Sequence, residues 1–70
     1  MKIQIQIIND LGSFSGEILE MSQEQYIQTQ ELSKNFYDSG FEMDLEDGGF
    51  IIFPPDIIKK SILKINKINV

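Results

Sequence analysis

The sequence contains no cysteine and no histidine, and all six of its basic residues are lysines. Without cysteine no disulfide can form, and without cysteine or histidine the usual ligands of a structural zinc ion are missing. The same two residue types supply many catalytic nucleophiles and general bases, so their absence argues against an enzyme. There is also no glycine-rich phosphate loop and no calcium-loop spacing. We therefore expect neither catalysis nor a bound metal or cofactor.

Long hydrophobic runs are lacking as well. No segment approaches the roughly 18 apolar residues that a membrane-spanning helix needs. The alternating start of the chain, Ile3-Gln4-Ile5, is too polar for the core of a signal peptide. A cytoplasmic protein without membrane contact is expected.

Apolar residues still make up 41% of the 70 residues, which is a normal share for a globular protein. This length predicts one domain over residues 1–70, near the size at which a single core gives only marginal stability. Self-association into a homo-oligomer is one way for such a small domain to bury more apolar surface.

Charge is the least balanced property of the chain, whose net charge is −5. Up to Ile58 there are eleven carboxylates against two lysines, whereas the segment after it holds four lysines and no carboxylate. This distribution and the absence of arginine argue against direct nucleic-acid binding. Two interpretations stay open: a surface whose charges only keep the protein in solution, or an acidic patch that binds a basic partner surface.

The first half of the chain predicts two strands and a helix. Apolar and polar residues alternate over residues 2–8, and a turn with Gly12 at a positive φ leads to a strand over 14–20. Gly16 within this strand marks a bulge or a close backbone approach. Ser22 and Gln25 then form a capping-box pattern, which predicts a helix over residues 23–38.

Gly40 is expected to end this helix in the left-handed conformation, with Phe41 contacting Phe36. Four apolar side chains share one arc of the helical wheel and predict the buried face: Tyr26, Leu32, Phe36 and Tyr37.

The second half predicts short strands. The expected elements are a strand over 41–46 with alternating burial, a hairpin turn at Asp47-Gly48, a strand over 50–53 covered on both faces, a helical turn at 55–58 and a strand over about 61–68. The last segment stays ambiguous, because its isoleucines also cluster on one side of a helical wheel and Asp56 could cap such a helix.

These elements predict an α+β domain in which a small antiparallel sheet of about five strands packs on one helix. Their order is strand, strand, helix, strand, strand, strand. This order resembles that of SH3-like and Sm-like small barrels, which would make the sheet curled. It is an analogy of order alone and implies no function.

The strand over 41–46 carries the first candidate binding residues. Glu42, Asp44 and Glu46 project from one face at intervals of ~6.5–7 Å, and Asp47 follows in the turn. This spacing is close to that of phosphates along a nucleic-acid strand, so the face could block a basic groove on a partner. The simpler interpretation is that a strand places its polar residues in solvent.

The lysine-rich segment provides an alternative site. Lys59, Lys60 and Lys64 could hold a small anionic ligand, such as a signalling nucleotide, with several protomers contributing lysines. The simpler interpretation is that these lysines guard an exposed strand edge.

The stretch EDGGFIIFPPDIIKKSILKI, from Glu46 to Ile65, and the helix capped by Ser22 resemble short uncharacterised proteins of phages and prophages of low-GC Gram-positive bacteria. The resemblance rests on size, on the frequent Ile, Lys and Asn, and on the ending of strand, Pro-Pro and strand. It implies a small acidic protein that inhibits a host enzyme or an antiviral defence system.

Three hypotheses follow. The favoured one is a non-enzymatic inhibitor that occludes a host or defence protein through Glu42, Asp44, Glu46 and Asp47. The second is a homo-oligomer that sequesters a small anionic ligand. The third is a structural or accessory module.

Overall fold

The computed structural model describes residues 1–68 and contains five strands in two antiparallel sheets, together with two helices. In chain order the elements are β1 (Lys2–Asn9), β2 (Gly12–Glu20), α1 (Gln23–Ser33), the 3₁₀ turn η1 (Phe36–Asp38), β3 (Phe41–Asp44), β4 (Phe50–Phe53), α2 (Pro55–Ile58) and β5 (Ile62–Ile68). The predicted α+β class is confirmed.

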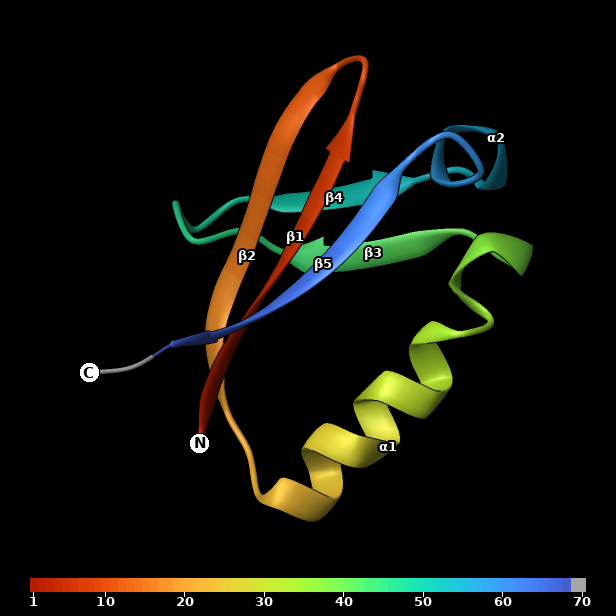
Figure 1. Ribbon diagram of the computed structural model, residues 1–70. Coiled ribbons are helices and arrows are strands. Elements are labelled where there is room, and N and C mark those ends of the chain that lie inside the picture. Colours follow the sequence, from red (N-terminus) through yellow and green to blue (C-terminus); the bar gives the residue numbers. More distant parts are fainter. Residues whose placement is uncertain (69–70) are drawn as a thin grey trace.

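The larger sheet has the strand order β2-β1-β5, and β3 pairs with β4 in the second sheet. In Figure 1, β3 and β4 lie across the larger sheet, and side chains of both sheets share one core. A bridge between Gly16 and Leu45 and a hydrogen bond from the Glu46 N–H to the Ser15 carbonyl oxygen join β2 to the end of β3. The sheets do not close into a barrel, so the analogy with SH3-like and Sm-like barrels does not extend beyond the order of the elements. β3 leaves β2 after this short contact and pairs with β4.

Gly16 allows this contact between the sheets. It lies where β2 bulges away from β1, opposite the stretch between Gln4 and Gln6. A Cβ at Gly16 would lie 3.1 Å from the Met43 Sδ and 3.3 Å from the Ile5 carbonyl oxygen. The bulge and close approach predicted for this glycine are therefore confirmed.

α1 begins as predicted. The Ser22 Oγ accepts a hydrogen bond from the Gln25 N–H at 3.2 Å, and the Gln25 Oε1 accepts one from the Ser22 N–H at 2.9 Å. The helix ends earlier than expected, at Ser33, and η1 follows after a short break. The Ser33 hydroxyl donates to the Thr29 carbonyl oxygen at 2.7 Å, a local contact that weakens helix continuation.

Gly40 does not end the helix in the left-handed conformation, because Gly12 and Gly48 are the glycines with positive φ in the described chain. Its role is steric. A Cβ at Gly40 would lie 2.9 Å from the Phe53 carbonyl oxygen, so any larger residue would push η1 and β4 apart. The predicted contact across this glycine is present, with the rings of Phe36 and Phe41 edge to face at 5.2 Å.

The buried apolar core is small and consists of Ile3, Ile7, Phe36, Phe53 and Ile58. α1 contributes no buried residue to it. Leu32 is 75% exposed and Tyr37 43% exposed, so the predicted buried helix face is wrong at these two positions. The reason is that the core is closed by Phe36 of η1, which lies beyond the end of α1.

The end of the described chain folds as a helical turn and a strand, as predicted. The Ser61 hydroxyl donates to the Ile57 carbonyl oxygen at 2.7 Å and accepts a hydrogen bond from the Asn9 Nδ2 at 3.1 Å. These bonds tie the turn after α2 to the end of β1. In residues 1–68 no helix has the length and apolar character that crossing a membrane requires.

Candidate functional site

The turn that connects β3 to β4 is held by backbone hydrogen bonds. The Leu45 N–H donates to the Gly49 carbonyl oxygen at 2.7 Å, and the Gly48 N–H donates to the Leu45 carbonyl oxygen at 3.1 Å. Asp47 adds a side-chain bond, since its Oδ1 accepts from the Gly49 N–H at 2.8 Å. Gly48 adopts a φ of 90°, which favours glycine. The predicted hairpin is therefore confirmed and its turn is well braced.

β3 has the alternating burial that the sequence predicts. Phe41 and Met43 are half-buried and pack against the core, whereas Glu42 and Asp44 are exposed on the opposite face. Since successive side chains on a strand point to opposite faces, the two carboxylates stand on the outer face of the hairpin.

β4 differs from the prediction, because only one of its faces is covered. Phe53 is buried and Ile51 half-buried, but Phe50 is 56% exposed and Ile52 is 65% exposed. The continuous apolar run of this strand predicts burial on both faces. The second face lacks a cover because no third strand joins the sheet of β3 and β4 and no helix packs over it in the described structure.

The register of the two strands places these exposed residues together. Asp44 lies opposite Phe50, and Glu42 lies opposite Ile52. Side chains directly opposite in an antiparallel pair have Cβ atoms about 4.5–5.5 Å apart. We call Glu42, Asp44, Phe50 and Ile52 the hairpin face. It combines two carboxylates with two exposed apolar side chains, a combination that the acidic pattern alone does not indicate.

Glu46 and Asp47 have different surroundings from the other two predicted acids. The Glu46 Oε2 accepts a hydrogen bond from the Gln4 Nε2 at 2.9 Å, which ties it to the larger sheet. Asp47 is engaged in the turn through the Gly49 N–H. Both side chains are exposed and add negative charge beside the hairpin face, but each also has a structural contact.

β2 carries two carboxylates, and one of them lies near the acidic segment. Glu17 directly follows Gly16, which forms the bridge to Leu45, and therefore lies beside the end of β3. β2 meets the acidic segment at Ser15 and Gly16, while Glu20 lies opposite Lys2 of β1. The charge of the hairpin face is not balanced locally. The sequence has no lysine between Lys34 and Lys59, and the salt bridge found in residues 1–68 joins Lys34 to Glu31.

The three predicted lysines occupy different parts of the fold. Lys59 and Lys60 follow α2, whereas Lys64 lies on β5 opposite Gln6 of β1. Lys60 borders a hollow of about 210 Å³ that Asp10 also lines. A carboxylate beside this ammonium group opposes the binding of an anion, so the geometry within one copy does not favour a phosphate site there.

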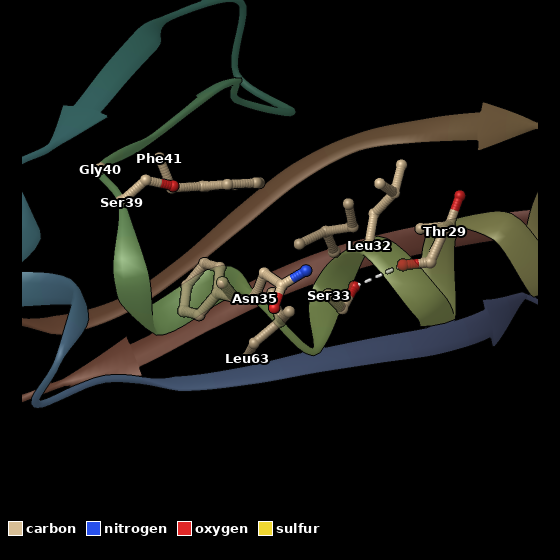
Figure 2. A pocket seen from close by; sticks show the side chains of 10 residues that line it. Thr29, Leu32, Ser33, Asn35, Ser39, Gly40, Phe41 and Leu63 are labelled. Atoms are coloured by element: carbon tan, nitrogen blue, oxygen red, sulfur yellow. Dashed lines mark hydrogen bonds between the residues drawn. The ribbon is translucent and has the colours of Figure 1, made fainter.

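A second feature that the sequence does not indicate is a hollow of about 310 Å³ between α1 and the sheets (Figure 2). Its apolar lining comes from Ile5, Leu32, Phe36, Phe41 and Leu63. The hydroxyls of Thr29 and Ser33 border it but donate to helix carbonyl oxygens at 2.8 and 2.7 Å. The hollow exists because α1 stands away from the core, and its polar groups are largely engaged within the helix.

No group of carboxylates within residues 1–68 has the arrangement of a metal site. No family model matches the chain, and no curated protein or solved structure matches it. Its function is therefore argued from the hairpin face and from the charges around it.

Proposed function

We propose that this chain is a non-enzymatic binding protein that occludes a basic surface of a partner protein with the hairpin face. One observation carries this proposal: Phe50 and Ile52 are more than half exposed and lie directly opposite Asp44 and Glu42. Scattered exposed apolar residues are common on proteins. Here an aromatic and a branched aliphatic side chain share one rigid strand face with unpaired carboxylates, which is the composition of an interface centre and its rim.

The two kinds of side chain have different roles in such an interface. Burial of Phe50 and Ile52 supplies most of the affinity, because aromatic and aliphatic anchors at the centre of an interface dominate binding energy. Glu42 and Asp44 select a basic partner and speed the encounter, since charges at the rim act mainly on specificity and association rate. The braced turn fixes these four side chains before binding and so reduces the entropy lost on association.

The chemistry of the partner follows from the face. It should present an apolar pocket with lysine or arginine side chains around it, as many nucleic-acid-binding grooves do. The resemblance to short phage proteins makes a host protein or a defence protein the proposed partner. The same negative charge repels phosphates, so we propose no direct contact with nucleic acid or with an anionic membrane.

A direct test is capture from a lysate of a low-GC Gram-positive bacterium, followed by titration of the purified captured protein. Phe50→Ser should weaken its binding by roughly 30-fold or more, as expected for an interface anchor worth ~2 kcal/mol. Glu42→Lys with Asp44→Lys should slow association and weaken binding at low salt, because two attractive charges become repulsive, and added salt should weaken the parent complex. Circular dichroism should show that all variants stay folded, because the four side chains are outside the core.

The matched control is Glu24→Lys with Glu31→Lys, which changes the net charge equally at exposed positions of α1, away from the hairpin. This control should bind within about two-fold of the parent. Equal loss in the control and in the hairpin variant would mean that only net charge matters. A different outcome is that a nucleotide raises the melting temperature of the parent protein but not of its lysine variants. That result would favour the alternative hypothesis, in which a homo-oligomer sequesters an anionic ligand.

A further inference from the structure

β5 is an edge strand. The larger sheet ends at β5, which pairs with β1 over Ile62–Ile68 and has no second partner strand in the described chain. Its other edge therefore carries a row of backbone N–H and C=O groups without strand partners. Such an edge is a template on which an extended chain can add a further strand.

A groove runs along this strand beside α1. Leu63 and Ile65 line it from β5, and Tyr26, Ser33 and Tyr37 line it from α1 and η1. The groove is open to solvent and has a volume of about 320 Å³. At one end the Lys67 Nζ lies 5.1 Å from the centre of the Tyr26 ring, which holds an ammonium group beside the groove.

Lysines flank the edge on both of its faces. Lys64 is exposed and belongs to the face of the sheet opposite Leu63 and Ile65, whereas Lys67 shares their face. Lys34 also lines the groove and forms an exposed salt bridge with Glu31 at 3.0 Å. A second copy that paired its own β5 here would bring four lysines of the two strands together, so these lysines disfavour self-pairing.

We propose that the edge of β5 and its groove bind an extended acidic peptide segment of a partner protein, which pairs antiparallel with β5. Apolar side chains of the peptide opposite Leu63 and Ile65 enter the groove. A carboxylate opposite Lys64 lies on the other face, and a carboxylate opposite Lys67 lies at the end of the groove. From its N-terminus onward, the peptide has the pattern acidic, any residue, apolar, acidic, apolar.

This surface is separate from the hairpin face and takes the opposite charge. The hairpin face presents carboxylates to a basic surface, whereas the edge of β5 presents lysines to an acidic segment. The two proposals can therefore fail independently. A variant of Phe50 tests the first and leaves β5 unchanged.

The experiment uses a fluorescent peptide with the core Asp-Thr-Val-Glu-Val, titrated with the full chain and followed by fluorescence polarisation. The expected result is saturable binding at low salt that is at least ten-fold tighter than that of the scrambled peptide Val-Val-Asp-Glu-Thr. A third peptide with N-methyl groups on alternate amides keeps the side chains and removes donors of the strand. It should bind at least ten-fold more weakly if the backbone pairs with β5. Equal binding of the three peptides would overturn the proposal.

Protein variants locate the site. Lys64→Glu with Lys67→Glu should weaken peptide binding roughly ten-fold or more, because two attractive charge pairs become repulsive. Lys64→Gln with Lys67→Gln should give a smaller loss of peptide affinity. It also tests the site if the glutamate variant does not fold. Lys59→Glu with Lys60→Glu makes the same charge change in the turn before β5, outside the stretch that pairs with the peptide, and should bind within about two-fold of the parent.

Amide hydrogen exchange gives a readout that charge alone does not move. The bound peptide should slow amide exchange in residues 62–68, and it should slow exchange there more than in any other segment. Slow exchange of this segment at high protein concentration without peptide would assign the edge to a second copy and overturn the proposal. So would protection confined to other elements, or an equal loss of binding in the Lys59 and Lys60 control.

Discussion

Phe36 and Leu32 provide a sharp test of how α1 relates to the core. The sequence pattern assigns both side chains to one buried helix face. The structure separates them, since Phe36 is 6% exposed within the core cluster and Leu32 is 75% exposed. We therefore expect Phe36→Ala and Leu32→Ala to have very different effects on the free energy of unfolding.

The magnitudes follow from this difference in burial. A buried Phe→Ala change costs about 3–5 kcal/mol, because contacts are lost and a cavity remains. Phe36 also makes edge-to-face contacts with Tyr37 and Phe41, at centroid distances of 5.2 Å each. A chain of this size has a total stability of only about 4–10 kcal/mol, so Phe36→Ala should bring the protein close to unfolding. Leu32→Ala should change stability by less than about 0.5 kcal/mol, since little apolar surface is uncovered.

Urea unfolding followed by circular dichroism measures both effects. With a slope of about 1 kcal/mol per molar urea, the midpoint of Phe36→Ala should fall by about 3 M or the variant should be unfolded without urea. Phe36→Leu, which keeps most of the volume, should remain folded with a loss below that of the alanine variant. A cost above about 2 kcal/mol for Leu32→Ala would refute the open position of α1. A loss below about 1 kcal/mol for Phe36→Ala would refute the core described above.

Two further predictions concern the ends of α1. Ser22→Ala removes the capping box and should destabilise α1 by ~1 kcal/mol. Because α1 buries no residue, this loss should appear as faster amide exchange in residues 23–33 and not as a large fall in the unfolding midpoint. Unchanged amide exchange in residues 23–33 would contradict this prediction. Gly40→Ala should destabilise the protein by about 1–3 kcal/mol, because the added Cβ would meet the Phe53 carbonyl oxygen. The neighbouring change Ser39→Ala should cost little. Equal melting temperatures for the two variants would contradict the steric role of Gly40.

Much of the fold could be predicted because it depends on local signals. Alternation defined β1 and the exposed carboxylates of β3, the capping box defined the start of α1, and paired prolines marked the turn before β5. Each of these features is decided by a few neighbouring residues. The close approach at Gly16 was also predictable, since a glycine within a strand commonly marks a bulge or a point where another backbone comes near.

The remaining features depend on packing between distant segments. The apolar run of β4 indicated burial on both faces, but whether Phe50 and Ile52 are covered depends on which other elements reach them. The role of Gly40 depends in the same way on Phe53, thirteen positions later in the chain. For this reason the sequence predicted the two carboxylates of the hairpin face and missed its apolar half.

The burial of apolar surface in this small protein is incomplete. Its accessible surface is 4968 Å², whereas the usual scaling for a monomer of this mass gives about 4,500 Å². α1 buries no residue, and one face of β4 is uncovered. The exposed part of Phe50 and the open groove along β5 contribute little to the stability of the isolated chain. Both would contribute on association, when their apolar surface leaves water. In the two proposals, the charges beside these surfaces select the partner, which is basic at the hairpin face and acidic at β5.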